Sequence, residues 1–282
     1  MTIFWHRRDL RTNDNAGLYR ALKNEGDVLP IFIFDRNILD KLEDKSDARV
    51  EFLQSTVSEL VQSYGTYGGS MRVFYGYPKD IWARLIEQYP NLRAVYANED
   101  YESYAMERDQ AVAEMLAAKD IGFNTYKDHV IFADLEVQKK DGGPYTVFTP
   151  YSRMWRTKLE SRLSQWVDND GTERTISYYL KPYATEKYFD RLLSGDRIPP
   201  EDKNVPSLAD MGFEATDIEI PPTQVSRKII REYDKTRNIP GIEGTSRLGI
   251  HFRHGTISIR EKCLRAMDLN ATYVNELIWR DF

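Results

Sequence analysis

Charged and polar residues follow two predicted strands of this chain. His6-Arg7-Arg8-Asp9-Leu10-Arg11 stands at the end of the strand predicted at Thr2–His6, and Asn98-Glu99-Asp100-Tyr101-Glu102 follows the strand predicted at Ala94–Ala97. In a parallel sheet, ligands bind beyond the carboxyl ends of the strands, where the strand order reverses. The cations of one segment and the carboxylates of the other could hold a polar aromatic ligand, or they could pair with each other as a structural ion network. Neither segment has the G-x-G-x-x-G spacing, so a nicotinamide dinucleotide is not expected here.

A glycine-rich loop lies near the other end of the chain. Asn238–Gly249 reads Asn-Ile-Pro-Gly-Ile-Glu-Gly-Thr-Ser-Arg-Leu-Gly and leads into a predicted helix that contains His251 and Arg253. Glycines let a backbone approach a ligand closely, and the two hydroxyls and the arginine can donate to phosphate oxygens. The segment is therefore either a phosphate-binding loop or a connecting loop built from turn residues.

Glu276 and Trp279 are three residues apart, so they lie on one face of a predicted helix. An indole can stack on a nucleobase while a neighbouring carboxylate accepts a hydrogen bond from it. The alternative is a core tryptophan beside a solvated glutamate. The four histidines have no spacing that suits a nucleophile and its base, so nucleophilic catalysis is not expected.

The elements that must position these residues begin with a regular alternation. Over about the first 130 residues, short apolar strands alternate with amphipathic helices, a pattern typical of a doubly wound, mainly parallel α/β sheet of Rossmann-like type. Strands are predicted at Thr2–His6, Val28–Phe34, Met71–Tyr75, Ala94–Ala97 and Phe123–Tyr126, and helices at 15–23, 47–64, 79–88 and 103–118.

The pattern changes after Ala133. We expect a hairpin at Val137–Phe148, a helix at Tyr151–Leu163, and an aperiodic, proline-containing connection at Ser164–Pro222. Helices are then predicted at 225–233, 258–267 and 273–282. The expected domains are therefore residues 1–133 (α/β), 134–222 (hairpin, helix and linker) and 223–282 (the beginning of a helical domain). The last helix has no C-cap, so either it frays at its end or the 282 residues are part of a longer protein.

Composition excludes several classes of protein. With 41% hydrophobic and 29% charged residues the chain can bury a core, so wholesale disorder is excluded. No apolar run is long enough to cross a bilayer, and the start of the chain does not resemble a signal peptide. A single cysteine and the lack of zinc-ligand spacing favour a reduced, cytoplasmic compartment and no metal site. Residues 223–282 carry 11 Lys plus Arg against 7 Asp plus Glu, although the whole chain has a net charge of -5. Either a polyanion prefers this part, or the excess is ordinary for a segment of this size.

Three segments together resemble the photolyase/cryptochrome family over nearly the whole chain. They are Phe4-Trp5-His6-Arg7-Arg8-Asp9-Leu10-Arg11 with Asp14-Asn15, the stretch from Tyr233-Asp234 to Gly244-Thr245-Ser246-Arg247-Leu248, and Asn275-Glu276-Leu277-Ile278-Trp279-Arg280-Asp281-Phe282. The resemblance implies an α/β domain, a linker and a helical FAD-binding domain. It also implies light-driven electron transfer from reduced flavin to a pyrimidine dimer flipped out of damaged DNA.

The resemblance also implies roles for particular residues. Glu276 and Trp279 would contact the dimer, as hydrogen-bond acceptor and stacking surface. Gly249 departs from the family, which usually has a serine there. The residues assigned to FAD are Tyr233, Thr245, Ser246, Arg247 and Leu248, in the phosphate and ribose region, and Arg280 near the flavin.

An antenna chromophore is a further implication of the resemblance. Arg49, Asp100, Glu102 and Arg253 match positions around a deazaflavin or FMN, with Arg253 in place of the usual lysine. Folate-binding members have an Asn-Glu pair where this chain has Tyr104 and Ala105. We therefore favour a deazaflavin or FMN over a folate, and an empty pocket is the third alternative.

The leading hypothesis is a DNA photolyase that splits cyclobutane pyrimidine dimers and acts as a monomer. The alternatives are a cryptochrome photoreceptor and a non-enzymatic nucleotide-binding α/β module. In the family the polypeptide continues beyond the position of Phe282, with most of the flavin pocket. We therefore expect the 282 residues alone to bind no FAD stably and to repair nothing.

Overall fold

The computed structural model describes residues 1–167, 171–199 and 204–282. Its contacts divide the chain into two compact units, and each unit contains two separate stretches of sequence. Unit 1 is Met1–Asp128 with Tyr183–Ile220, and unit 2 is His129–Pro182 with Pro221–Phe282. The two units are described separately.

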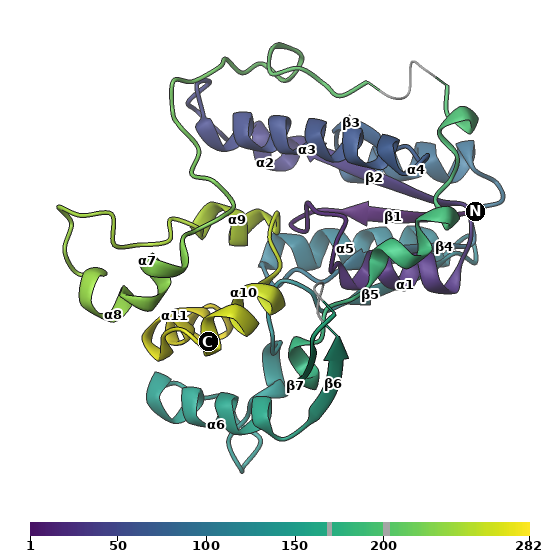
Figure 1. The fold of residues 1–282 in the computed structure, drawn as a ribbon. Helices are drawn as coiled ribbons and strands as arrows, with labels where there is room; N and C mark the ends of the chain where they lie inside the picture. Colours follow the sequence, from purple (N-terminus) through teal and green to yellow (C-terminus); the bar gives the residue numbers. More distant parts are fainter. Residues whose placement is uncertain (168–170, 200–203) are drawn as a thin grey trace. The chain divides into compact units, whose positions relative to one another are not determined.

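Unit 1 is built on a five-stranded sheet in the order β3-β2-β1-β4-β5, in which all neighbouring strands are parallel (Figure 1). The strands are β1 (Thr2–His6), β2 (Val28–Asp35), β3 (Arg72–Gly76), β4 (Ala94–Asn98) and β5 (Gly122–Tyr126). β1 and β2 are buried along their whole length, as expected for strands covered on both faces. The predicted doubly wound α/β sheet is confirmed, and its strand order reverses between β1 and β4.

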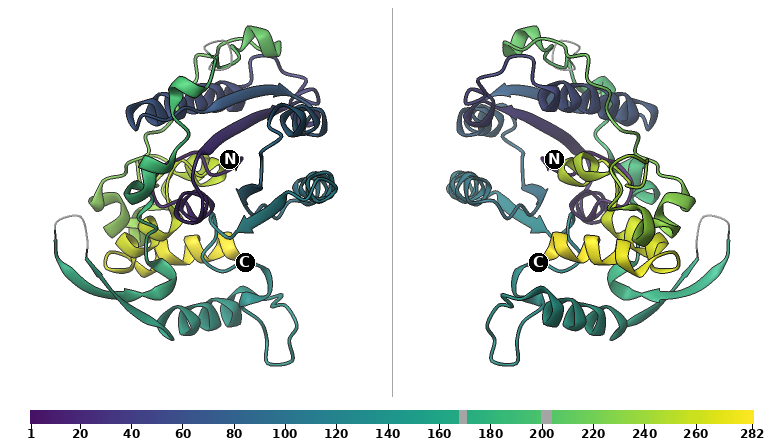
Figure 2. Two further views of the ribbon diagram at one scale, coloured as in Figure 1. Left: turned by 90° about the vertical axis from the view of Figure 1, so that its right-hand side faces the viewer. Right: turned by 90° about the vertical axis from the view of Figure 1, so that its left-hand side faces the viewer.

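Helices cover both faces of this sheet (Figure 2). Leu18 and Leu22 of α1 and Val57 and Leu60 of α3 belong to the core on one face. Trp82 of α4, with Val112 and Leu116 of α5, belongs to the core on the other face. The helices are α1 (Ala16–Asn24), α2 (Arg36–Leu39), α3 (Ala48–Thr66), α4 (Pro78–Gln88) and α5 (Ser103–Ala117).

The described residues between 183 and 220 (183–199 and 204–220), expected to be part of an interdomain linker, instead belong to unit 1. Leu192, Met211 and Phe213 are buried in one core of the sheet and Ile198 in the other. The amide of Leu193 donates to the carbonyl of Val28, 2.8 Å away. Periodicity missed this segment because its few buried apolar residues, among them the adjacent Leu192 and Leu193, follow no sustained repeat. Its helical pieces are short 3-10 turns at Thr185–Arg191, Gly195–Arg197 and Ala209–Met211. Pro200, one of the prolines behind the linker expectation, lies outside the described residues.

Unit 2 combines the middle of the chain with its C-terminal helices. Its core contains Phe132, Trp155 and Leu180 from the first stretch, and Cys263 and Ile278 from the second. Its elements are a 3-10 turn (Asp134–Glu136), α6 (Phe148–Glu160), β6 (Leu163–Val167), β7 (Glu173–Ser177), a 3-10 turn (Tyr178–Leu180), α7 (Arg227–Arg231), α8 (Tyr233–Thr236), α9 (Gly249–His254), α10 (Ile259–Met267) and α11 (Ala271–Asp281). The structure thus divides the chain differently from the expected boundaries at 133 and 222.

The hairpin expected at Val137–Phe148 is not formed. A turn is present, since the amide of Lys139 donates to the carbonyl of Gly143 at 2.9 Å and Gly142 has a φ of +83°. The flanking residues do not pair as strands, and Phe148 begins α6. The hairpin of unit 2 lies later, where β6 and β7 pair antiparallel.

No helix in the described part of the chain is long and apolar enough to cross a membrane.

Candidate functional site

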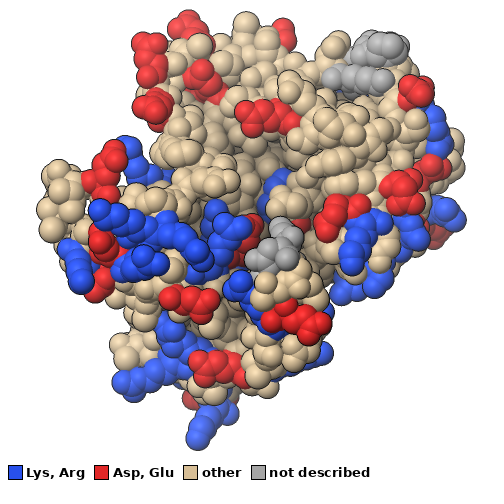
Figure 3. Space-filling model, viewed as in Figure 1, with Lys and Arg blue, Asp and Glu red and all other residues tan. Residues whose placement is uncertain are grey.

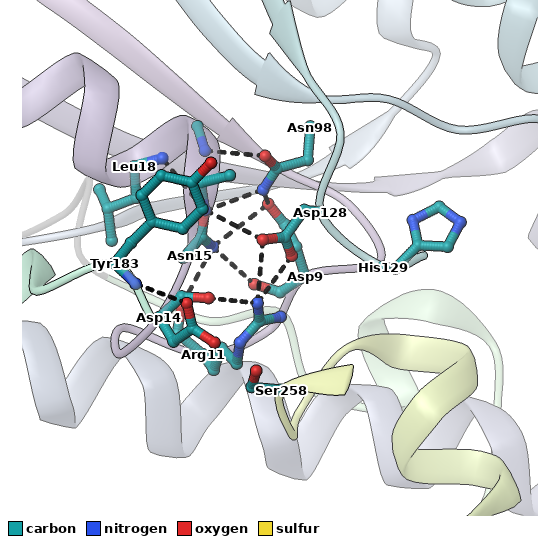
Figure 4. A network of polar contacts seen from close by, with 12 residues as sticks. Asp9, Arg11, Asp14, Asn15, Leu18, Asn98, Asp128, His129, Tyr183 and Ser258 are labelled. Carbon is teal, nitrogen blue, oxygen red and sulfur yellow. Dashed lines mark hydrogen bonds and ion pairs between the residues drawn. The ribbon is translucent and has the colours of Figure 1, made fainter. Parts of the chain in front are cut away.

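The point where the strand order of unit 1 reverses is filled by a buried polar network (Figure 4). Asp9 accepts hydrogen bonds from the Arg7 amide at 2.7 Å and from Asn98 Nδ2 at 2.5 Å. Asn98 Oδ1 in turn accepts from the Gly17 amide at 2.8 Å, which joins β4 to α1. Burial alone would raise the pKa of Asp9, but the His6 imidazole and these hydrogen bonds outweigh it and hold that pKa well below its usual range. This part of the network is structural.

A buried ion pair fixes the turn between β1 and α1. Arg11 Nη2 donates to both carboxylate oxygens of Asp128, at 3.0 and 2.8 Å, and Asp128 Oδ1 also accepts from the Ala16 amide at 2.9 Å. Asp14, which has a positive φ of 43°, accepts from the Tyr183 amide at 2.7 Å. The segment that the sequence suggested as a ligand site therefore anchors α1 and residues 183 onward.

The residues assigned to an antenna chromophore are only partly brought together. Asp100 and Glu102 both pair with Arg8 Nη1, at 3.0 and 2.9 Å, so here the two segments form the ion network that was the alternative to a ligand site. Arg49, also in unit 1, lies at the start of α3 and pairs with Asp47 at 2.5 Å, and its side chain is 68% exposed. Arg253 belongs to α9 of unit 2.

In unit 2 the glycine-rich loop has a defined conformation. A Cβ at Gly244 would approach the Thr236 carbonyl oxygen to 2.6 Å, so only glycine fits against α8 at this position. Thr236 Oγ1 donates to the Gly244 carbonyl at 3.1 Å, and Leu248 is buried beneath the loop. Arg247 between them has a left-handed φ of 52°. The loop is therefore anchored on both sides of Thr245-Ser246-Arg247.

This loop presents donors that suit a diphosphate. The side chains of Thr245 and Arg247 are exposed, and neither has a partner among the described residues. Ser246 accepts a hydrogen bond from the Tyr273 hydroxyl at 3.2 Å, and Tyr233 packs edge-on against Tyr273. Gly249 stands where the family usually has a serine. A Cβ at this position would meet nothing within 4 Å, so the structure has room for that side chain, but this protein lacks its hydroxyl. The hydroxyl and guanidinium groups fit the phosphate end of FAD with one donor fewer.

Glu276 pairs with an arginine that the sequence analysis missed. Arg237 Nη1 pairs with Glu276 Oε1, and the Arg237 guanidinium lies 5.5 Å from the centroid of the Tyr233 ring. Burial raises the pKa of Tyr233, and the Glu276 charge adds to this effect. Arg237 thus links the residue assigned to the dimer with a residue assigned to FAD. Arg237 could have been found from the sequence as a cation one helical turn after Tyr233.

Trp279 is not a core residue. Its side chain is 50% exposed, and its ring stacks parallel on Phe148 with the centroids 3.8 Å apart. Arg280, assigned to the flavin neighbourhood, donates from Nε to the His129 carbonyl at 3.0 Å and from Nη2 to the Phe252 carbonyl at 2.7 Å. Its guanidinium therefore joins α11 to His129 and to α9 within unit 2.

Asp281 is a second residue that the sequence analysis missed. Its carboxylate accepts from Trp155 Nε1 at 2.8 Å and from the amides of Phe132 at 3.0 Å and Ile131 at 3.2 Å. Burial raises the pKa of Asp281 to about 6, although these hydrogen bonds oppose the shift. The available signal was its position four residues after Leu277, on the buried face of α11.

Charge differs strongly between the two units. Unit 2 has 19 Lys plus Arg against 14 Asp plus Glu, a net charge of +5, whereas unit 1 has 20 against 30, a net charge of -10. On the face drawn in Figure 3, Lys and Arg gather over the helices of unit 2, where Arg227, Lys228, Arg231 and Lys235 are exposed. A polyanion is therefore expected to bind unit 2.

The fold and site define a class of protein: an α/β domain without a dinucleotide glycine motif, in one chain with a basic helical unit that carries a phosphate-type loop. The sequence model described as DNA photolyase matches residues 2–168, and the chain belongs to this family. It is 31% identical to an uncharacterised 31.6 kDa protein of a Synechococcus species, over 99% of this chain and 98% of that protein. It is 29% identical to the deoxyribodipyrimidine photo-lyase of Alkalihalophilus pseudofirmus, over 99% of this chain and 57% of that enzyme.

Solved structures agree with this assignment. The archaeal photolyase of Sulfolobus tokodaii, whose structure is described as holding two FAD molecules, one implicated as a novel light-harvesting cofactor, matches with a TM-score of 0.68 and 25% identity over 100% of this chain and 58% of that chain. A cryptochrome of a Synechocystis species has the same fold, with a TM-score of 0.73 and 17% identity over 100% of this chain and 60% of that chain. The chain thus spans about three fifths of the length of the photolyases it matches, and nearly all of the 31.6 kDa relative.

Proposed function

We propose that this chain acts in light-dependent DNA repair as part of a flavin-dependent photolyase that splits cyclobutane pyrimidine dimers, and that the 282 residues alone do not suffice for this activity. One observation carries the proposal: α11 presents an exposed indole at Trp279 three residues from Glu276, which Arg237 and Tyr233 connect to the phosphate-type loop. A photoreceptor that leaves DNA unchanged needs no pair of lesion contacts, so this arrangement favours repair over a cryptochrome role.

In this proposal FAD is the cofactor, and when bound it supplies the light-activated electron donor. Thr245, Ser246 and Arg247 would hold its phosphates, with Tyr233 and Leu248 supporting the loop from α8 and from the core. Arg280 would act indirectly, since its guanidinium is engaged by backbone carbonyls. Trp279 would stack on a flipped base, and Glu276 would accept a hydrogen bond from it. The positive charge of unit 2 favours the phosphates of DNA.

The proposed antenna ligand is a deazaflavin or a flavin bound by unit 1. Arg49, Asp100 and Glu102 belong to that unit, and Arg8 holds the two carboxylates beside each other. Fluorescence titration of the protein with FMN, a deazaflavin and a folate is expected to show the tightest binding for one of the first two. Tighter binding of the folate would contradict this assignment.

The preference for damaged DNA tests the proposed repair function directly. In the dark, the 282-residue protein is titrated with a labelled duplex that contains one cyclobutane thymine dimer, and with the same duplex undamaged. A dimer weakens local pairing and lowers the cost of flipping, and stacking on an indole adds roughly 1–3 kcal/mol, so about ten-fold tighter binding of the damaged duplex is expected. Equal affinities at the same salt concentration would contradict repair.

A further inference from the structure

We propose that Phe148 is a positioning residue for lesion recognition: it fixes the plane of Trp279 and leaves one indole face open to the flipped base. The inference rests on the proposed function and extends it to a residue outside the three segments that carry the family resemblance. Phe148 is the first residue of α6, and Trp279 lies on α11, 131 positions later in the sequence.

The geometry of the two rings carries the proposal. The planes of Phe148 and Trp279 differ by 2°, and the centroids are 3.8 Å apart, the distance of two rings in direct van der Waals contact. Since Phe148 covers one face of the indole and half of the Trp279 side chain is exposed, the exposed half is mainly the opposite face. A base that stacks there completes a three-layer arrangement of phenyl, indole and base.

The surroundings keep this stack in place. Phe282 meets the edges of both rings, at centroid distances of 5.4 Å from Trp279 and 5.9 Å from Phe148. α6 is held to α11 independently of the stack, because the Tyr151 hydroxyl donates to the Asp281 carbonyl at 3.0 Å and Arg156 Nη2 donates to Asn275 Oδ1 at 2.9 Å. Phe148 therefore cannot move away without a change in side-chain rotamer.

Such a stack acts on binding by pre-organisation. A half-exposed tryptophan on a helix samples several rotamers, and a ligand that needs one of them must select it. Phe148 removes that selection cost in advance, so the base meets an indole already in its bound orientation. Phe148 is itself half-buried and packs against the core of unit 2, which holds its ring beneath the indole.

The first experiment asks whether Phe148 holds the indole. In a Trp166→Phe background the remaining tryptophans are Trp279 and the fully buried Trp5, Trp82 and Trp155. Acrylamide quenching of fluorescence then reports mainly on Trp279. Phe148→Ala is expected to raise the quenching constant about two-fold, because the second indole face opens to solvent. Phe148→Tyr, which keeps a stacking ring, and Val147→Ala, which removes an exposed neighbour without a ring contact, should quench like the parent protein. Unchanged quenching in Phe148→Ala would overturn the proposal.

The second experiment asks whether the stack matters for recognition. The ratio of the Kd for undamaged duplex to the Kd for dimer-containing duplex is expected to fall about three- to ten-fold in Phe148→Ala and to stay at the parent value in Phe148→Tyr and Val147→Ala. A purely structural role would lower the melting temperature and weaken both duplexes equally, which would overturn the inference. If the parent protein itself shows no preference for the dimer, the proposed function fails. A preference that Phe148→Ala retains overturns the positioning role alone.

Discussion

Asp281→Ala is expected to lower the free energy of unfolding by about 3–6 kcal/mol, because it removes the acceptor of three buried donors. Trp155 Nε1 and the amides of Ile131 and Phe132 all donate to this one carboxylate. A buried donor left without a partner costs about 1–3 kcal/mol. The expected loss is a large part of the roughly 5–15 kcal/mol that stabilises a typical domain, so unit 2 should be at least partly unfolded at 37 °C.

Urea unfolding followed by circular dichroism measures this loss. Asp268→Ala is the matched control, since Asp268 follows α10 with an exposed side chain, and it should stay within about 0.5 kcal/mol of the parent protein. A small effect of Asp281→Ala would mean that water replaces the carboxylate and that α11 is held by its apolar face alone.

The same carboxylate makes stability depend on pH in a specific window. Its pKa is about 6 in the folded protein, above the ordinary value of 3.8, so the folded state binds the proton more tightly than the unfolded state does. The contribution is fully present below about pH 4 and is lost as the pH rises through 6, by at most about 3 kcal/mol. Asp281→Asn should lower stability at every pH but remove this slope. A parent protein and variant with parallel pH profiles would show that the folded pKa is not raised.

The sequence predicted the sheet because the first 128 residues obey local rules. Val28–Phe34 is a continuous apolar run, and Asp47 stands before a helical stripe as an N-cap, so strand and helix could be assigned from neighbouring residues alone. The sequence did not predict the packing of segments that contact residues far away along the chain. Leu192 and Phe213 belong to no sustained apolar pattern in the sequence, and only the folded sheet shows that they fill its core.

The candidate site was predictable to a similar extent. The phosphate-type loop and the pair Glu276 and Trp279 are local in sequence, so motif and spacing found them. Phe148 and Asp281 act through partners more than 100 positions away. No local pattern marks Phe148, and the helical spacing from Leu277 indicates only that Asp281 is buried, not which donors it accepts from. Arg8 shows the opposite problem. It follows a strand whose end was a predicted ligand site, but it pairs with Asp100 and Glu102, the carboxylates that were assigned to the ligand.

Trp279→Ala is expected to weaken binding of dimer-containing DNA by about ten- to a hundred-fold, because stacking of a base on an aromatic ring is worth roughly 1–3 kcal/mol. Undamaged duplex should bind almost as before, since its affinity comes from phosphate contacts made by other cations. The 50% exposure of Trp279 sharpens this test. Truncating a buried tryptophan costs about 3–5 kcal/mol, whereas here the loss of unfolding free energy should be close to the roughly 1–3 kcal/mol of two aromatic contacts, with Phe148 and Phe282.

Glu276→Ala is expected to behave differently, and the contrast separates the two roles. It removes an acceptor for the base and the partner of Arg237, but it leaves the indole in place. Binding of the dimer should therefore fall less than in Trp279→Ala, and in a preparation that carries flavin the larger effect should be on dimers split per photon absorbed. Both duplex affinities and the melting temperature are measured on each variant, with Leu163→Ala as the control for loss of an exposed apolar side chain. If Trp279→Ala weakens damaged and undamaged duplex equally, the indole contributes to folding or to general DNA binding, and its assignment to the lesion is wrong.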